Sequence, residues 1–144
     1  MRPRLYTETK WRKKGFSKNG AALSEFALVA VVFFILFFGI IDMSRLMLMY
    51  HHVGNAAREG TRYAIVHGST SLTPASAADV ADYIKSISLV DANNVQVVTT
   101  WPDGNNNPES RVIVRVDYPF TFFLPIWFGP MITLSSQSEM VISY

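Results

Sequence analysis

The sequence predicts an α+β protein in which a long N-terminal helix, with a membrane-spanning first half, packs on a short helix and a small antiparallel three-stranded sheet. Three observations predict this class. An uncharged run, residues 26–41, is followed by a helical pattern that continues to about residue 66, with no proline between Pro3 and Pro74. A short amphipathic segment comes next. The last part of the chain holds three segments in which apolar and polar residues alternate.

The charge is divided unevenly along the chain. Residues 1–20 hold seven Lys and Arg against the single acid Glu8, a net +6, so the rest of the chain carries −4 of the total +2. A basic tail can bind nucleic acid, but directly before an apolar run it is typical of the signal that keeps a terminus in the cytoplasm. We therefore expect a basic cytoplasmic leader at residues 1–20 and no nucleic-acid partner.

The apolar run is the core of a predicted membrane helix. Its 16 residues fall short of the roughly 20 that span a bilayer, but the segment can be extended on both sides, by small residues before Glu25 and by apolar residues after Asp42, to about residues 22–46. Asp42 and Arg45 are spaced i,i+3, so they can pair at the far interface. A cleaved secretory signal needs small residues after its apolar core, and "GIIDMSRLM" offers none. A buried helix of a soluble protein does not explain the adjacent basic cluster. We expect a single-pass helix within a segment 21–66.

The second half of this helix must pack outside the membrane. A helix over residues 22–66 would be on the order of 65 Å long, about twice the hydrocarbon thickness. One stripe recurs at steps of three and four: Met43, Met47, Tyr50, Gly54, Ala57, Thr61 and Ala64. Small residues allow another backbone to approach closely, either a second chain or the protein's own sheet. They are Gly54, Ala56, Ala57 and Gly60.

Residues 67–144 are expected to form a small extracytoplasmic α+β domain. Thr73 and Pro74 supply an N-cap and a first turn for a short helix. Its apolar face comprises Ala77, Val80, Ala81, Ile84 and Ile87. The alternating segments 94–101 and 111–118 are joined by turn formers and predict a hairpin, and residues 131–143 predict a third strand. The aromatic segment 119–130 is either a core plug or a contact surface for membrane or partner.

No pattern in the sequence points to catalysis. His51 and His52 are adjacent and would diverge on a helix, and no metal-ligand spacing, phosphate loop or nucleophile elbow is present. The absence of cysteine excludes disulfides and thiol catalysis. We therefore expect no enzyme activity, no cofactor and no metal site.

The order of a basic leader, a glycine, small residues, a glutamate and a long apolar helix resembles one class of prepilin-type signals. The resemblance implies cleavage between Gly20 and Ala21 by a prepilin peptidase on the cytoplasmic side, which makes Glu25 the fifth residue of the mature chain.

The resemblance extends to a family. "GAALSEFALV", "FGIIDMSRLMLMY" and "NAAREGTRYAIV" are similar to TadE-like proteins, pseudopilin-like components of the tight-adherence (Tad) systems that assemble Flp pili. Phe26 fits the aromatic residue that often follows the glutamate, whereas the proline that commonly breaks the apolar segment is absent.

This resemblance implies a pilin-like fold and a non-catalytic protein of the bacterial inner membrane that acts in secretion and adhesion through protein assembly. The implied partners are a prepilin peptidase, other pilin-like proteins, the inner-membrane assembly platform and the lipid bilayer. The implied assembly residues are Glu25 and Phe26. Two alternatives are an unprocessed membrane-anchored binding or sensor domain, and an accessory to a secreted hydrolase.

Glu25 would have a specific role after processing. A lone carboxylate in a membrane helix is unfavourable. Cleavage creates a positive α-amine at Ala21, one helical turn away, so Glu25 could pair with it or with that of a neighbouring chain. The alternative is that Glu25 only reaches to the interface.

Overall fold

The computed structural model describes residues 18–88, 93–124 and 129–143. Its elements are the helices α1 (Lys18–Val66) and α2 (Ala77–Ile87) and the strands β1 (Gln96–Thr100), β2 (Arg111–Thr121) and β3 (Met131–Val141). The predicted α+β class, with a long apolar helix, a short helix and a three-stranded antiparallel sheet, is confirmed. Most of the predicted leader lies outside the described residues, and the predicted domain limits at residues 20 and 66 stay predictions.

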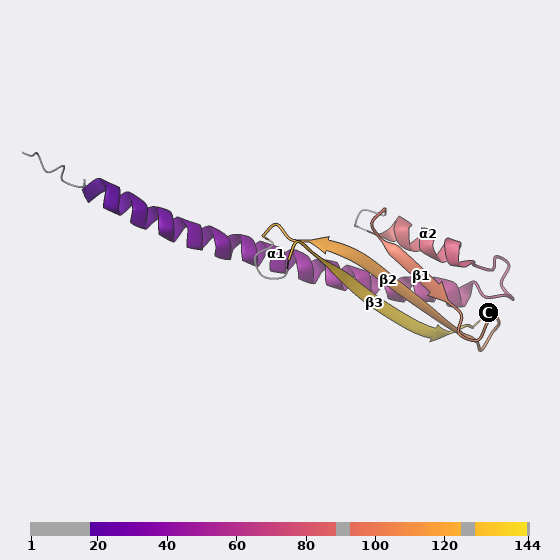
Figure 1. Ribbon diagram of the computed structural model, residues 1–144. Coiled ribbons are helices and arrows are strands. Elements are labelled where there is room, and N and C mark those ends of the chain that lie inside the picture. Colours follow the sequence, from indigo (N-terminus) through magenta and orange to yellow (C-terminus); the bar gives the residue numbers. More distant parts are fainter. Residues whose placement is uncertain (1–17, 89–92, 125–128, 144) are drawn as a thin grey trace, which may run out of the picture. The chain divides into compact units, whose positions relative to one another are not determined.

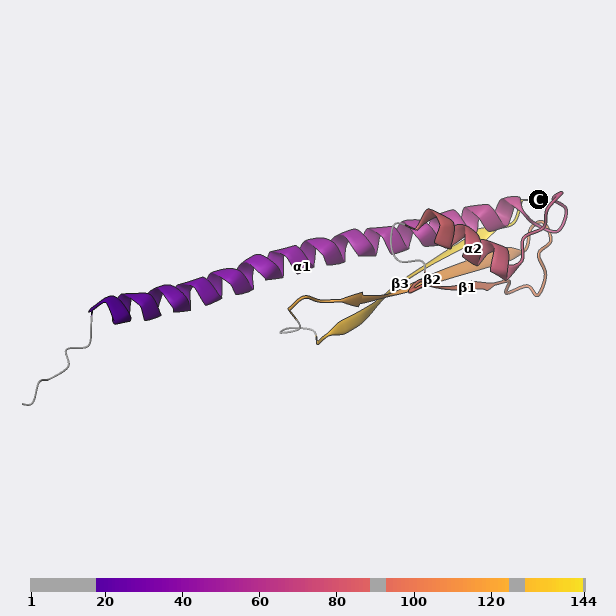
Figure 2. The same cartoon turned by 90° about the horizontal axis from the view of Figure 1, so that it is seen from above.

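The chain divides inside α1 into two compact units, Met1–Leu36 and Phe37–Tyr144. In the first unit, the residues that the structure describes, from Lys18 onward, all belong to α1. The second contains the rest of α1, α2 and the whole sheet, which lie side by side in Figures 1 and 2. The core of the protein is therefore in the second unit.

The sheet has the strand order β1-β2-β3, and both pairs are antiparallel. Alternation in β2 sets its faces: Val112, Val114 and Val116 are buried, whereas Arg111 and Arg115 are exposed, as the sequence predicted. Both helices lie on the same side of the sheet (Figure 2), and Gly60 of α1 lies close to both Ile84 of α2 and Val114 of the valine face. Beyond the pairing of β1 with β2, the strands β2 and β3 continue as a two-stranded ribbon that ends at the pair Thr121 and Met131.

The α1 surface under the sheet is built from small residues. Ala57 is fully buried, and the Thr61 hydroxyl donates to the Ala57 carbonyl oxygen at 2.7 Å. Gly60 lies so close to α2 that an added Cβ would collide with Ile84. The small residues could pack on a second chain or on the protein's own sheet. Ala57 and Gly60 pack within the protein itself, against its sheet and short helix.

The predicted stripe of α1 is right only in its C-terminal part. Met43, Met47 and Tyr50 are exposed. The helix instead faces the sheet through positions one residue earlier in each turn, among them Asp42 and Val53. Because this part of α1 carries apolar residues at many neighbouring positions, the sequence periodicity does not specify which side is buried.

Helix α2 begins later than predicted. Its N-cap is Ser76, not Thr73, and Ser76 forms a capping box with Asp79. The Asp79 carboxylate accepts from the Ser76 backbone N–H at 2.8 Å, and hydrogen bonds from Ser76 hold the pKa of Asp79 below its usual value. Val80 and Ile84 are buried as expected, but Ala77 and Ile87 are exposed. The reciprocal hydrogen bonds explain why the helix starts at Ala77.

Two segments form hydrogen bonds with the end of α1: the loop between β1 and β2, and the residues after β3. The Asn106 side chain donates to the carbonyl oxygens of His67 and Ala75, at 3.4 and 3.3 Å, and accepts from Trp101 Nε1 at 3.2 Å. Ser143 donates from both its backbone N–H and its hydroxyl to the Ile65 carbonyl oxygen, each at 3.2 Å. The carbonyls of Ile65 and His67, at the end of α1 where intrahelical partners run out, thereby gain acceptor contacts.

Candidate functional site in the long helix

The predicted processing and assembly residues lie in the first turns of α1. Gly20, Ala21, Glu25 and Phe26 are all exposed, and a Cβ added at Gly20 would meet no atom within 4 Å. The helix places Ala21 and Glu25 on one face, since residues four apart are neighbours. Ser24 adds a hydrogen bond from its hydroxyl to the Ala21 carbonyl oxygen at 2.8 Å. Their roles in processing and assembly stay predictions.

The helix that carries these residues is long and apolar enough to cross a membrane. Its large apolar side chains are exposed at consecutive positions, for example Val31, Val32, Phe33 and Phe34. A helix that is apolar on all sides suits a lipid environment, because no polar face remains for water. This feature suggests a single-pass membrane anchor.

Asp42 lies directly after the apolar run and, among the residues that the structure describes, is a buried charged side chain, at 4% exposed. Its carboxylate accepts the backbone N–H groups of Phe123 at 3.1 Å and Leu124 at 3.0 Å. It also accepts from Arg45 Nη1 at 3.1 Å, which confirms the pairing predicted from their spacing. We call Asp42, Arg45, Phe123 and Leu124 the Asp42 cluster. It joins α1 to the connection between β2 and β3.

Arg45 completes the cluster by stacking on aromatic rings. Its guanidinium carbon lies 4.2 Å from the ring centroid of Phe123 and 5.2 Å from that of Phe120. Such cation–π contacts strengthen where water is excluded. The sequence showed the Asp42–Arg45 pair but not its second set of partners, which are more than 80 residues away along the chain.

For the aromatic segment 119–130, the core alternative holds for its first residues, and the contact with membrane or partner stays a prediction. Phe120 is buried and Phe122 packs against the core, whereas Phe123 is 65% exposed. Residues 125–128 lie outside the described part of the chain. The segment therefore contributes to the core through its first residues and presents Phe123 at the surface.

Comparison with known proteins finds a similarity in the helix that holds these features. The family model described as TadE-like protein matches residues 20–62. Over these residues, less than a third of the chain, it is similar to TadE-like proteins. The TadE-like segment includes the predicted processing and assembly residues, the Asp42–Arg45 pair and Gly60. No curated protein and no solved structure matches the chain.

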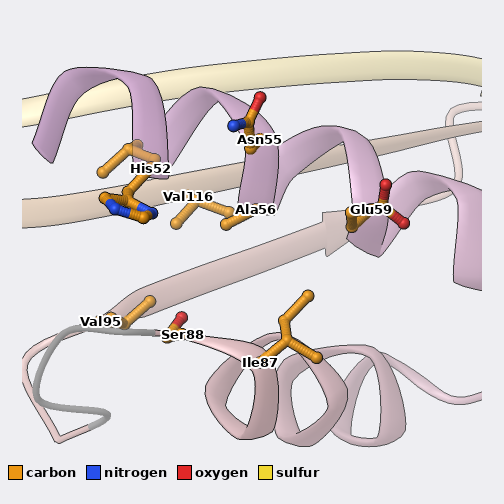
Figure 3. Close-up of a pocket in the computed structure, with 9 residues that line it drawn as sticks. His52, Asn55, Ala56, Glu59, Ile87, Ser88, Val95 and Val116 are labelled. Atoms are coloured by element: carbon orange, nitrogen blue, oxygen red, sulfur yellow. The ribbon is translucent and has the colours of Figure 1, made fainter. Parts of the chain in front are cut away.

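A small cavity lies beside the TadE-like helix, between α1, the C-terminal end of α2 and the sheet (Figure 3). It measures 170 Å³. His52, Asn55 and Glu59 reach it from α1, and its other lining residues are mostly apolar: Val53, Ala56, Ile87, Ser88, Val95 and Val116. Within the described residues, no group of three or more His, Asp or Glu could hold a metal ion. The lining offers a shallow apolar surface rather than a set of reactive groups.

Proposed function

We propose that this chain is a pseudopilin-like component of a Tad/Flp pilus assembly and secretion system, and that it acts through protein–protein assembly in adhesion. The observation that carries the proposal is the coincidence of the TadE-like match with a helix that is apolar on all sides. The resemblance to TadE-like proteins implies a pilus-assembly component rather than an enzyme.

The proposed topology follows from the charges that flank the apolar run. The net +6 of residues 1–20 favours a cytoplasmic N-terminus, with the domain of residues 67–144 on the outer side of the bacterial inner membrane. The proposed partners are a prepilin peptidase, other pilin-like proteins and the inner-membrane assembly platform. The α-amine released at Ala21 would then pair with Glu25 in the same chain or a neighbouring one.

Gly20→Val is expected to block processing. A peptidase that cuts after Gly20 requires a residue without a side chain, because a β-branched residue narrows the backbone conformations available to the leader. The intact mass of the membrane-bound protein should correspond to the full chain, whereas the unmodified protein should lack residues 1–20.

Gly39→Val is a matched control for this substitution. Gly39 lies in the same helix, and a Cβ there meets no atom within 4 Å, so processing should be normal. If Gly20→Val yields the same mature mass as the unmodified protein, cleavage does not occur at Gly20–Ala21. An unprocessed native chain would favour the alternative of a membrane-anchored binding or sensor domain.

Glu25→Ala is expected to preserve membrane insertion but to weaken recovery of pilin-like partners. Polar contacts between membrane helices contribute about 1–2 kcal/mol, so loss of the pair should reduce partner association roughly 5- to 30-fold. The measurement is quantitative co-purification from cells that express the complete assembly system.

Two variants make this experiment specific. Glu25→Asp keeps the charge and should restore part of the association. Glu59→Ala removes an exposed carboxylate of the same helix that pairs with Arg62 at 3.4 Å, and it should leave partner recovery unchanged. Normal recovery with Glu25→Ala would show that Glu25 is an ordinary interfacial charge.

A further inference from the structure

Phe123 and Leu124, which follow β2, are held next to the end of the apolar run. Asp42 follows Ile41, the last residue of that run, and it accepts the backbone N–H groups of Phe123 and Leu124. These two residues therefore lie at the level of α1 where its uncharged segment ends. This placement depends on hydrogen bonds within the unit Phe37–Tyr144.

The surface at this level is apolar although it contains an ion pair. Phe123 is 65% exposed and Met131, at the start of β3, is 57% exposed. On α1, Ile40 and Met43 are also exposed. The charges of Asp42 and Arg45 compensate each other at 3.1 Å, and the two backbone N–H groups supply further partners for the carboxylate. We call Phe123 and Met131 the ribbon-end surface; Ile40 and Met43 are exposed on α1 near the same level.

We propose that the ribbon-end surface lies in the headgroup boundary of the bilayer that α1 crosses, so that the sheet contacts the membrane beside its own anchor. The proposal rests on the proposed membrane anchoring of α1. Lipid is the occupant because Ile40 and Met43 continue the apolar run along the same helix, and this run would reach the boundary at Asp42.

The composition of the Asp42 cluster suits this boundary. Aromatic side chains are enriched at the level of lipid headgroups, and long basic side chains near helix ends extend toward the interface. Phe123 and Arg45 provide both kinds of group, with the guanidinium 4.2 Å from the ring centroid. An Asp42 carboxylate with three protein donors can occupy the boundary without relying on water alone.

The chain contains no cysteine, so single cysteines can report depth in the full-length protein. We would place a bimane label at Phe123→Cys, Met131→Cys, Ile40→Cys or Val141→Cys in phosphatidylethanolamine–phosphatidylglycerol vesicles that contain brominated lipids. Val141 is the matched control, because it is 56% exposed and lies at the opposite end of β3 from Met131.

The expected result is loss of fluorescence at positions 123 and 131 with bromines near the headgroup, and a smaller loss with bromines near the chain ends. The label at position 141 should keep its fluorescence in both. Phe123→Cys removes the ring on which Arg45 stacks. The label at position 131 tests the same surface with that ring intact. Quenching at both ribbon positions supports the proposal.

The outcomes separate failure of the anchor from failure of the inference. If the label at position 40 is not quenched by either lipid, α1 does not enter the bilayer as proposed. If position 40 is quenched while positions 123 and 131 behave like 141, the anchor stands and the ribbon-end inference is wrong. Shielding of positions 123 and 131 from aqueous iodide without lipid quenching would indicate a protein contact and would also overturn it.

Discussion

Gly60→Leu is expected to destabilise the packing of α1, α2 and the sheet strongly. A Cβ at this position would collide with Ile84 Cδ1, lie 2.8 Å from Ile84 Cγ1 and lie 3.3 Å from Val114 Cγ1. Ile84 and Val114 are fully buried, so neither has free space into which it can move. Overpacking costs typically about 1–3 kcal/mol, and leucine adds three more carbons beyond Cβ.

Thermal unfolding of the detergent-solubilised full chain, followed by circular dichroism, measures this effect. Leucine is a good helix former, so a lower melting temperature would report packing rather than helix propensity. Gly54→Ala is the control, because a Cβ there makes only ordinary contacts, at 3.6 Å to Arg58 Nη2 and 3.9 Å to Ser136 Oγ. It should stabilise by about 0.5–1 kcal/mol. An unchanged melting temperature with Gly60→Leu would contradict the close approach of α2.

Asp42→Ala is expected to release the connection between β2 and β3 from α1. The N–H groups of Phe123 and Leu124 lose their acceptor, and Arg45 loses its carboxylate. These N–H groups are only partly buried, but hydrogen bonds to a charged group contribute about 1.5–3 kcal/mol, so amide exchange at these two residues should accelerate by roughly tenfold or more. Asp42→Asn should have a smaller effect, since one carbonyl oxygen remains as an acceptor.

Hydrogen–deuterium exchange of the full chain in detergent or vesicles measures this release. Glu59→Ala serves as the control because its pair with Arg62 is exposed, and exposed pairs contribute about 0–1 kcal/mol. The amides of β2 near Val112, at the other end of the sheet, should exchange as in the unmodified protein. Unaltered exchange at Phe123 and Leu124 in Asp42→Ala would show that other contacts hold the connection.

Local patterns predicted the elements but not all of their contacts. The alternation of Val112, Val114 and Val116 set the buried face of β2, because residues two apart share a face of a strand. The small residues around Gly60 predicted a close approach, yet the sequence alone could not say whether α2, the sheet or another chain would supply it. Thr73–Pro74 and Ser76 both fit a helix start, and the capping box between Ser76 and Asp79 decides for Ser76.

The Asp42 cluster could be predicted only in part. Residues three apart on a helix are neighbours, so the Arg45 pair followed from spacing. The contact with Phe123 and Leu124 uses backbone N–H groups, which every residue except proline possesses, and no side-chain pattern marks them. An acidic residue directly after an apolar run was the available signal that a further partner existed.

The sheet is attached to α1 near both ends, through Asp42 and through the carbonyl oxygen of Ile65. These attachment points span 24 residues of helix, about 36 Å at 1.5 Å per residue. The strands β2 and β3 each have 11 residues, about 36 Å at 3.3 Å per residue. This stretch of α1 and the strands β2 and β3 therefore have about the same length. A tensile force along α1 would act on both attachments at once, in shear, and would not detach the sheet from one end first.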